Sequence, residues 1–542
     1  MNSRELPEGW KATFLPQVAE INRTNRNPNN DAPEETFHYI DISSIDGETG
    51  LITQVQEILG KDAPSRARRV IQENDVIIST VRPYLRGFAI IPEEYSGEIC
   101  STGFVVLSAR SNILPQYLYY FARSNDLVNE LTRRMKGAMY PAVNISDVKE
   151  IEIPLPSLEE QRQIVAILEQ AEELRRLRAE ADRLTEKILP SAFIEIFGDP
   201  RENPKRWETV MLGEIAQVTK GKKPNQLVTL GNEGLPYLEA AFLRVESSPQ
   251  IVPNGDLDNV ICAESSEVLI LWDGANAGDV FMALKGVVAS TMAKVSCMDE
   301  SILPGFLYYC LLCHSPYMKS TTSGSTVPHV RSHAVRSLSI PYPPLREQQH
   351  FVELVEDLQV IQQRQAEAHK LLDSSYQSLS VQAFTGELTA SWREEQKALI
   401  AERQAVILTM LSRLAQQNRR QVLITALMKY LFLLQMEGRA KEFYRYVPYK
   451  YGPFARELYA DLEDLKGRGL ITVTATDDKG ERTEIALQIE QGKEIAQMVQ
   501  KLPKDVWKDA EGIVDLYGEL SLKELLDFVY AEYPDYAIRS ER

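Results

Sequence analysis

Cysteine is scarce in this sequence, and long apolar stretches are missing. Its five cysteines among 542 residues follow no regular spacing, which excludes a disulfide framework and indicates a reducing compartment. No apolar run approaches the roughly 18 residues that a membrane-spanning helix needs. Residues 1–14 also lack the basic and then apolar layout of a secretion signal. We therefore expect a cytoplasmic protein that has no membrane partner.

Positive charge is also in short supply. Lysine and arginine number 60 against 77 aspartates and glutamates, for a formal net charge of -17. Proteins that bind nucleic acid on their own are usually basic, because neutralising phosphates supplies much of the affinity. Any DNA contact must therefore come from local basic patches or from partner proteins. The candidate patches are Arg66, Arg68 and Arg69; Arg82 and Arg86; Arg133, Arg134 and Lys136; Lys220, Lys222 and Lys223; and Arg331 and Arg336.

The motifs of catalysis are missing as well. Residues 342–345 read Tyr-Pro-Pro-Leu, which is not the Asn/Asp-Pro-Pro-Tyr motif with which adenine methyltransferases grip a flipped base. No glycine-rich cofactor loop follows a strand, no Walker-A sequence occurs, and the acids are too scattered for a nuclease metal site. We therefore expect a non-catalytic protein without a cofactor, with chemistry supplied by partners.

The sequence carries one module twice. Residues 153–161 and 340–348 both read I-P-x-P-x-L-x-E-Q, and they begin 187 residues apart. At the same offset Gly137 matches Gly324 and Pro141 matches Pro328. Further upstream, Leu-Pro-x-x-Leu-Tyr-Tyr occurs at 114–120 and again at 303–309. A repeat of this kind predicts two domains of the same fold.

Each copy has the pattern of a mixed domain with short strands and a helix. Alternating or continuous apolar runs bounded by Gly and Pro predict strands at 37–42, 75–80, 87–91 and 103–107 in the first copy, and at 267–272 and 286–290 in the second. Helical spacing follows at 114–132 and 303–313. An ordinary solvated surface is the simpler interpretation of any one basic patch, but the recurrence of such patches in loops of both copies strengthens the case for DNA contact.

A long helical pattern follows each proline motif. Apolar residues recur at steps of three and four, which is typical of a coiled-coil seam. We expect the two helices to pair with each other in antiparallel fashion, with Pro190 ending or kinking the first. The predicted seams are Ile167, Gln170, Leu174, Leu177, Ala181, Leu184 and Ile188, and Leu354, Leu358, Ile361, Gln365, Ala368, Leu372 and Leu379.

The last 150 residues differ from the repeat. A helical stretch at 394–417 leads to an apolar helix at 422–434, and an amphipathic helix follows at 455–466. A strand at 469–473 and a turn at 477–480 come next. Helix, helix and then a turn between two strands is the order of a winged helix.

With these motifs in view, residues 1–390 resemble the DNA-specificity (S) subunit of type I restriction-modification systems. The resemblance rests on residues 153–161 and 340–348, on Gly324-Ser-Thr326 with its weaker copy Gly137-Ala-Met139, on Ser101-Thr-Gly-Phe104, and on the strand and loop at 75–79 and 267–274. Two departures stand out: Ala138-Met139 replaces the usual Ser-Thr, and Thr385-Gly-Glu-Leu388 would normally end such a protein. The remaining residues faintly resemble winged-helix domains of antitoxin-like and phage-associated proteins.

The resemblance implies an α+β fold with two mixed α/β target-recognition domains, separated by a pair of long antiparallel helices. A mainly helical, winged-helix-like domain follows. The expected boundaries are 1–155 for the first target-recognition domain, 156–200 for the first conserved helix and linker, 201–343 for the second recognition domain, 344–390 for the second helix, and 391–542 for the C-terminal domain.

In such a family each recognition domain reads half of a split site in double-stranded DNA, and the helices set the spacing and dock the methyltransferase subunits. The implied partners are DNA, two methyltransferase (M) subunits and a restriction (R) subunit. The helix starts Leu158, Gln161, Leu345 and Gln348 are the candidate partner-binding residues.

Base edges would be read by polar side chains in loops between strands, with phosphates held by Lys and Arg. For any single position, a role as an ordinary turn residue is about as good an interpretation as a role in DNA binding. The DNA-binding candidates are Arg82, Tyr84, Arg86, Lys136, Tyr140 and Asn144 in the first copy, and Lys222, Lys223, Asp273, Asn276, Ser325, Thr326, His329 and Arg331 in the second.

One metal pattern competes with this interpretation. Cys310, Cys313, His329 and His333 fit a zinc spacing, and residues 310–314 also match a haem-attachment string. Their counterparts in the first copy are Phe121, Ser124, Ala142 and Ser146, and a fold that needs no ligand in one copy rarely needs a metal in the other. We therefore expect no metal site.

Two other function classes were weighed against a specificity subunit. A single-chain modification and restriction enzyme would require the catalytic motifs that the sequence lacks. The alternative is a stand-alone DNA-binding or regulatory protein whose C-terminal domain binds DNA or a protein partner. Testing residues 395–542 alone for duplex binding would separate this alternative from simple docking.

Overall fold

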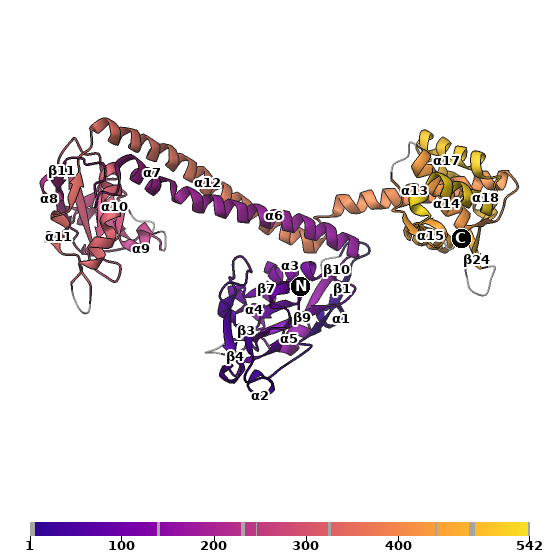
Figure 1. Ribbon diagram of the computed structural model, residues 1–542, viewed down its shortest axis with the longest axis horizontal. Coiled ribbons are helices and arrows are strands. Elements are labelled where there is room, and N and C mark those ends of the chain that lie inside the picture. The colour runs from indigo at the N-terminus through magenta and orange to yellow at the C-terminus, as the bar shows by residue number, and fades with distance from the viewer. Residues whose placement is uncertain are drawn as a thin grey trace. The chain divides into compact units, whose positions relative to one another are not determined.

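The structure is a computed structural model that describes residues 6–137, 141–228, 233–244, 247–323, 327–438, 442–475 and 483–539. Figure 1 shows sheet-containing repeats, long helices and a C-terminal helical domain. The chain forms two compact units, residues 1–164 with 382–542 and residues 165–381, which are described separately. Within the described ranges, no helix is both long and apolar enough to cross a membrane.

The first repeat contains two four-stranded sheets. The first sheet has the order β2 (Ala19–Ile21), β9 (Phe104–Ala109), β6 (Val76–Ser79) and β7 (Phe88–Ile90). The second has the order β4 (Gln56–Leu59), β3 (Thr36–Ile40), β8 (Ile99–Ser101) and β5 (Ala67–Val70), with β3 and β8 parallel. Strand β6 is buried along its whole length, as expected from its continuous apolar run. Helices α3 (Pro115–Arg123), α4 (Asn125–Arg133) and α5 (Ile145–Lys149) follow the strands, while β1 (Lys11–Phe14) pairs with β10 (Glu152–Leu155).

The second repeat has the same topology. Its first sheet has the order β12 (Ala216–Lys220), β19 (Met292–Cys297), β16 (Val268–Leu271) and β17 (Val280–Met282). The other has the order β14 (Ile251–Pro253), β13 (Gly234–Leu238), β18 (Gly286–Val288) and β15 (Cys262–Ala263), again with one parallel pair, β13 and β18. Helices α10 (Pro304–Ser320) and α11 (Ser332–Arg336) follow, and β11 (Thr209–Met211) pairs with β20 (Ser339–Pro341). The predicted duplication is therefore a duplication of fold.

The repeated proline motif forms a strand, a turn and a helix start in both copies. Gln161 is fully buried: its side-chain oxygen accepts from the Leu114 amide at 2.8 Å, and its amide group donates to the carbonyls of Asn112 and Pro156 at 3.1 and 3.0 Å. Gln348 is also fully buried and repeats these bonds with the Leu303 amide and the Ser301 and Pro343 carbonyls, each at 2.9 Å. A glutamine is suited to this position because one side-chain end supplies an acceptor and two donors.

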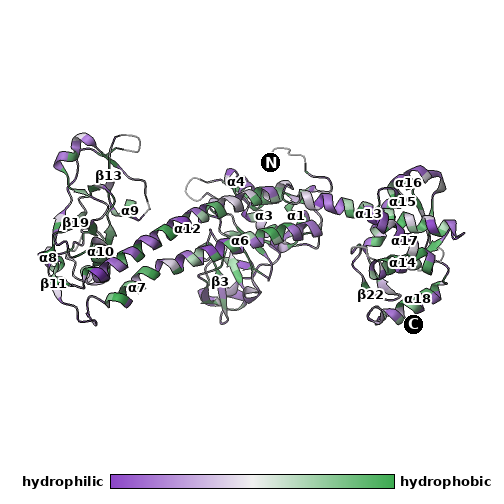
Figure 2. Ribbon diagram, turned by 90° about the horizontal axis from the view of Figure 1, so that it is seen from above, coloured by the Kyte–Doolittle hydropathy of each residue, from purple (hydrophilic) through white to green (hydrophobic). Residues whose placement is uncertain are grey.

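The long helices are α6 (Leu158–Glu186), α7 (Ile188–Phe197) and α12 (Leu345–Thr385). The side-chain pairs that join α6 to α12 include Arg175 Nε to Asp373 Oδ1 at 2.7 Å, Asp182 to His369 at 3.8 Å, and Gln365 to Thr185 at 3.1 Å. Residue numbers rise in one helix as they fall in the other, so the helices are antiparallel, as predicted, and Figure 2 shows them side by side. The break between α6 and α7 falls at Lys187, and Pro190 lies in the first turn of α7, where proline is tolerated.

The predicted seam of α6 is wrong. Leu174, Leu177, Leu184 and Ile188 expose 55%, 47%, 55% and 44% of their surface. The contact with α12 is instead polar and amphipathic, because Arg175 extends over the ring of Tyr376 at 4.8 Å while it pairs with Asp373. Long arginine stems can cover a neighbouring helix in this way. Periodicity therefore located an apolar stripe on α6, but this stripe is exposed and does not pack on α12. On α12 the predicted Leu358 is buried and Gln365 contacts α6, but the predicted Ile361 exposes 45% of its surface.

Aromatic residues at the helix ends anchor each recognition repeat. Phe197, the last residue of α7, packs edge-to-face on Phe306 and Phe351 of the second repeat, with ring centroids 4.8 and 5.6 Å apart. Phe384, which lies 187 residues later in α12, packs on Tyr117 and Phe121 of the first repeat at 5.5 and 5.4 Å. The end of α12 therefore anchors the first repeat in the same way that the end of α7 anchors the second repeat.

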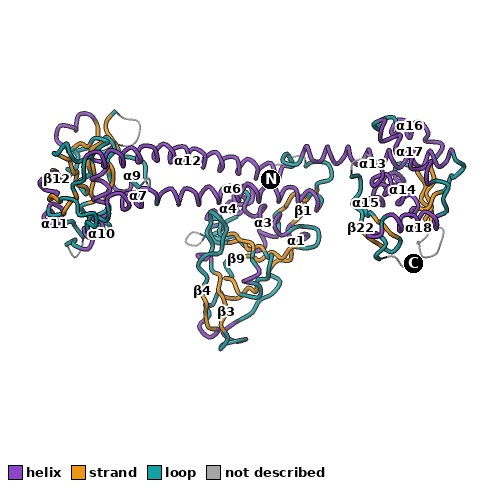
Figure 3. Tube along the Cα trace, turned by 45° about the horizontal axis from the view of Figure 1, so that its top comes forward, coloured by secondary structure: helices purple, strands orange, loops and turns teal. Residues whose placement is uncertain are grey.

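The C-terminal domain begins directly after residues 385–388. Its helices are α13 (Ala390–Gln416), α14 (Ile424–Glu437), α15 (Glu457–Gly467), α16 (Gly492–Val499), α17 (Lys504–Tyr517) and α18 (Leu522–Glu532). A three-stranded sheet has the order β21 (Val422–Leu423), β25 (Thr483–Leu487) and β24 (Ile471–Ala475), and a hairpin of β22 (Val447–Tyr449) and β23 (Gly452–Phe454) precedes α15. This is the element order expected for a winged helix, with a hydrophobic core of its own. Figure 3 shows how helices dominate it. The predicted turn at 477–480 lies outside the described residues.

Candidate nucleic-acid interface

The two loops that hold the candidates of the first repeat lie next to each other. One follows β6 and the other precedes α5, about 60 residues later in the chain. Val81 pairs with Ala142, which also pairs with Lys136. The Arg82 amide donates to the carbonyl of Pro141 at 3.3 Å, and the Val143 amide donates to that of Thr80 at 2.9 Å. The fold therefore brings together two groups of candidates that are distant in sequence.

The second repeat brings the corresponding loops together in the same way. His329, which matches Ala142 at the repeat offset, pairs with both Asp273 and Ser323. The Gly274 amide donates to the Pro328 carbonyl at 2.9 Å, and the Val330 amide donates to that of Trp272 at 2.9 Å. Each repeat thus presents one composite loop surface at an equivalent place.

In the first repeat the candidate side chains have different surroundings. Arg82 and Asn144 are exposed, and Tyr84 exposes 48% of its surface. The Arg86 guanidinium is committed to the fold, since it donates to the Arg123 carbonyl at 2.6 Å and to the Asn125 side chain. Lys136 forms an ion pair with Asp147 at 3.2 Å. Tyr140 lies outside the described residues.

In the second repeat Lys222, Lys223, Asn276 and Arg331 are exposed. Asp273 pairs with Lys220 at 2.7 Å, so the lysine compensates the negative charge of its carboxylate. His329 is exposed and lies 2.9 Å from the Ser323 hydroxyl through Nε2. Ser325 and Thr326 lie outside the described residues.

Two features of these surfaces were not predicted from the sequence. Leu85, between the candidates Tyr84 and Arg86, exposes 57% of its surface; an apolar residue in a loop gave no reason to single it out. Asp279 forms ion pairs with Arg244 and with Lys319 at 2.6 Å. Partial burial tends to raise the pKa of Asp279, but bonds from these two cations bring it below its usual value. The Asp279 cluster therefore links the loop after β16 to α10.

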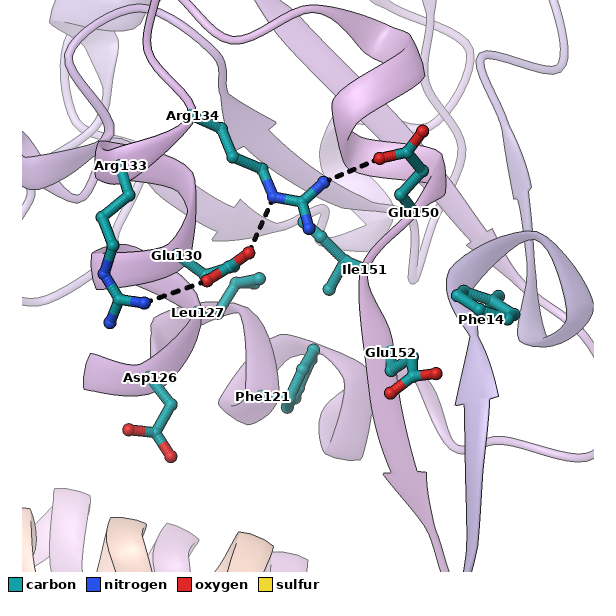
Figure 4. Close-up of a pocket in the computed structure, with 10 residues that line it drawn as sticks. All are labelled: Phe14, Phe121, Asp126, Leu127, Glu130, Arg133, Arg134, Glu150, Ile151 and Glu152. Carbon is teal, nitrogen blue, oxygen red and sulfur yellow. Dashed lines mark hydrogen bonds and ion pairs between the residues drawn. The ribbon is translucent and has the colours of Figure 1, made fainter. Parts of the chain in front are cut away.

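The patch of Arg133, Arg134 and Lys136 does not form the free basic surface that the sequence indicated. Figure 4 shows a pocket of about 550 Å³ in which both arginines are directed toward carboxylates. Arg134 binds Glu130 at 2.7 Å and Glu150 at 3.1 Å, and Arg133 binds Glu130 at 3.3 Å. The hydrogen bond from Arg134 lowers the pKa of Glu130. Asp126 and Glu152 also line the pocket, so its acids outnumber its arginines and it is unsuited to phosphate.

The candidate partner-binding residues divide into two kinds. Gln161 and Gln348 are fully buried and use both ends of their side chains within the fold, so a partner cannot touch them without breaking these bonds. The prediction of direct partner contact by the two glutamines is therefore corrected to a role in positioning the helix starts. Leu158 is half-buried and Leu345 exposes 40% of its surface, so both remain accessible.

The cysteines of the zinc pattern lie in or near the core of the second repeat. Cys310 is fully buried, and burial raises its pKa well above the usual value. Burial also raises the pKa of Cys313 to about 11, which disfavours the thiolate that a metal would require. Over the ranges that the structure describes, no three His, Cys, Asp or Glu side chains gather in a metal-binding arrangement.

If the C-terminal domain is a winged helix, as its element order predicts, the recognition-helix position is that of α15. Its exposed residues include Glu463 and Asp464, together with one cation, Lys466, which pairs with Glu463 at 3.3 Å. Acidic side chains on the helix that would enter a DNA groove oppose binding to phosphate-lined DNA. The charge of α15 therefore gives no support to groove reading by this domain.

Comparison with known proteins agrees with the duplicated architecture. The family model described as type I restriction modification DNA specificity domain matches residues 7–185 and again 204–369. The chain belongs to this family. The two matched segments correspond to the two structural repeats with their helices, and residues 370–542 lie outside the match.

Individual specificity subunits show the same relationship. The type I restriction enzyme MjaVIII specificity subunit of Methanocaldococcus jannaschii is 34% identical over 155 residues, which are 28% of this chain and 36% of that subunit. The putative MjaX specificity subunit of the same organism is 24% identical over 391 residues, covering 67% of this chain and 90% of the relative.

A solved structure extends the agreement to the fold. A chain whose structure addresses complex assembly and conformational transition of the type I restriction-modification system is 33% identical, with a TM-score of 0.51. The match covers 70% of this specificity-family chain and 99% of the solved one.

Proposed function

We propose that this chain is the sequence-specific DNA-recognition subunit of a type I restriction-modification complex and that it reads a bipartite site. The observation that carries the proposal is the duplicated loop surface. Val81, Ala142 and Lys136 in the first repeat, and Asp273, His329 and Ser323 in the second, bring equivalent loops together. Two readers of one fold suit two half-sites.

The antiparallel pair of α6 and α12 would set the length of DNA between the half-sites that is not read. Its polar contacts, such as Arg175 with Asp373 at 2.7 Å, fix the register of one helix against the other. In dimeric DNA-binding proteins, the geometry between reading units fixes the half-site spacing. A single chain with two readers would achieve the same result by means of its helices.

The helices also supply a surface on which methyltransferase subunits would dock. Apolar side chains stay exposed on α6 at Leu174, Leu177 and Leu184, and on α12 at Val360 and Leu371. Exposed apolar stripes at helical spacing are typical of protein interfaces. The proposed complex contains two methyltransferase subunits and a restriction subunit, which carry the chemistry, and it acts on DNA in the cytoplasm.

Mapping methylated bases in a host that carries this chain with the methyltransferase encoded beside it tests the proposal. The expected result is a split motif of two short half-sites with an unread spacer of fixed length and modified adenines. Alanine at Asn276, an exposed residue of the second loop surface, should relax one half-site only. A continuous motif, or no motif at all, would refute the assignment.

The alternative is that the C-terminal domain binds DNA or a protein by itself. This domain has a core of its own, so residues 395–542 can be purified and tested for duplex binding. Because the exposed face of α15 carries Glu463 and Asp464, we expect no salt-dependent binding to a mixed-sequence duplex. Tight binding of the isolated domain would favour the regulatory alternative.

A further inference from the structure

The tip of the loop after β6 holds two large apolar side chains in solvent. The turn η3 (Pro83–Leu85) connects β6 to β7, and Pro83 is buried at its base. Tyr84 and Leu85 expose 48% and 57% of their surface. Neighbouring apolar residues that both remain exposed at the tip of a loop point to a contact that the isolated chain does not make.

This tip is held in place from both sides. Arg82 and Arg86, which flank the turn, both have left-handed backbone conformations with φ of 47° and 55°, where residues other than glycine are uncommon. Local strain of this kind persists only when surrounding contacts enforce it, and it gathers at functional sites. Here Arg86 donates to the Arg123 carbonyl at 2.6 Å, and the Arg86 amide donates to the Pro83 carbonyl at 2.9 Å.

The backbone at Leu85 is also supported from below. A Cβ atom at Gly47 would lie 2.1 Å from the Leu85 carbonyl oxygen, so Gly47 allows the turn to approach this closely. The tip therefore cannot move inward without a steric clash. The backbone that carries the two exposed side chains is therefore packed closely against the domain.

The tip belongs to the composite loop surface of the first repeat. Val81 pairs with Ala142, and the Arg82 amide binds the Pro141 carbonyl, so the turn grows directly out of the surface assigned to DNA. Exposed Arg82 lies beside the apolar tip and can contact a phosphate. An apolar pair flanked by a cation suits a nucleic-acid groove.

The second repeat has different chemistry at the equivalent loop. After β16, Trp272 is buried, and the exposed residues are Ala275 and Asn276. Asp273 is half-buried and paired with Lys220. The second loop therefore offers hydrogen-bonding groups where the first offers aromatic and aliphatic surface.

We propose that Tyr84 and Leu85 contact the bases of one half-site through apolar surface, whereas the second repeat reads its half-site through hydrogen bonds. This inference rests on the proposed function. The apolar base surface would be thymine methyl groups in the major groove or the faces of a partly opened base step, both of which accept leucine and aromatic side chains. The two half-sites would thus be read by different physical means.

The test compares methylation motifs of the full chain and its variants, each co-expressed with the methyltransferase of its own system. Leu85→Ala and Tyr84→Ala should relax base preference at one or two positions of a single half-site by roughly 5- to 100-fold, as expected for one mismatched base pair. The other half-site serves as an internal control for folding. Leu284→Ala, which alters a leucine of the second repeat that exposes 49% of its surface, should leave the motif unchanged.

Binding to a duplex that carries the wild-type motif then separates the two sources of apolar surface. Replacing thymines of the affected half-site with deoxyuridine should weaken wild-type binding but not that of Leu85→Ala if methyl groups are contacted. The fluorescence of a 2-aminopurine placed at the base step should increase on binding of the wild-type protein only if the step opens.

Unchanged preference in both alanine variants would overturn the inference, as would loss of both half-sites together. Wild-type protein that produces no split motif would instead refute the proposed function itself, and with it the inference. The inference is tested by the motifs of the alanine variants and the proposed function by the motif of the wild-type protein, so the two failures are distinguishable.

Discussion

Replacing Gln348 with leucine should destabilise the second repeat far more than a surface change in the same helix. The side chain is fully buried and forms three hydrogen bonds of 2.9 Å, to the Leu303 amide and to the Ser301 and Pro343 carbonyls. Leucine has a similar volume but supplies no donor or acceptor. The substitution therefore removes the bonds and leaves little cavity.

The magnitude follows from the groups that lose a partner. A buried backbone amide without a partner costs about 1–3 kcal/mol, and carbonyls that lose one bond cost less because each has a second lone pair. Burying the leucine side chain offsets part of this loss. A net loss of about 2–4 kcal/mol is expected in the free energy of unfolding of the second repeat.

Hydrogen–deuterium exchange of the full chain is the suitable assay, because a chain with several cores need not unfold in one step. Peptides that cover residues 301–307 should exchange faster in Gln348→Leu by a factor of roughly 30 to 1,000, which follows from the loss of about 2–4 kcal/mol. Gln349→Leu is the matched control, because Gln349 is the exposed neighbour in α12. If the two variants exchange equally, the three bonds do not stabilise the fold and the reasoning fails.

Three further predictions use other parts of the molecule. Burial lowers the pKa of Lys429 to about 7 from 10.5. Between pH 7 and pH 9 the Lys429 amine is therefore protonated in the unfolded chain but loses its proton in the folded one. Because stability rises with pH wherever the unfolded state binds more protons, the free energy of unfolding of the C-terminal domain should rise by about 2 kcal/mol over this range. Denaturant unfolding of residues 395–542 should show a shallower slope with pH in Lys429→Met, and equal slopes would contradict the burial argument. Phe384→Ala removes a ring packed on Tyr117 and Phe121 and should cost about 3–5 kcal/mol in the first repeat, measured by exchange in residues 115–123; exposed Val381→Ala is its control. Leu174→Ser with Leu177→Ser should abolish co-purification of the methyltransferase and leave thermal unfolding unchanged, since both side chains are exposed; retained co-purification would place the partner elsewhere.

Much of the fold followed from the sequence because its signals were local and occurred twice. The proline motif at 153–161 and 340–348 marked both helix starts, and continuous apolar runs such as 76–79 marked buried strands. After residue 390 the predicted order of helices followed by strands was also found, and its assignment to a winged helix stays a prediction. The adjacency of the two candidate loops within each repeat came only from the structure, through the pairs Val81 with Ala142 and Asp273 with His329.

Where prediction failed, the outcome depended on neighbours that are far away in the chain. The leucines at 174 and 177 have the spacing of a seam, but Arg175 occupies the contact because Asp373 and Tyr376 lie opposite it. The glutamines of the repeated motif were predicted to bind a partner, yet each fills a buried site formed by a loop about 45 residues earlier. Arg133 and Arg134 were predicted to form a basic patch, but in the fold their charges are compensated by Glu130 and Glu150.

The sequence by itself determined that this protein consists of two copies of one fold, two antiparallel helices and a different C-terminal domain. It did so because repeats, apolar periodicity and turn residues act over a few positions. Only the tertiary structure decided which side chains remain exposed to meet DNA or a partner. Exposure depends on which distant residues pack against each position, as the solvent-exposed Leu85 and the fully buried Gln348 demonstrate.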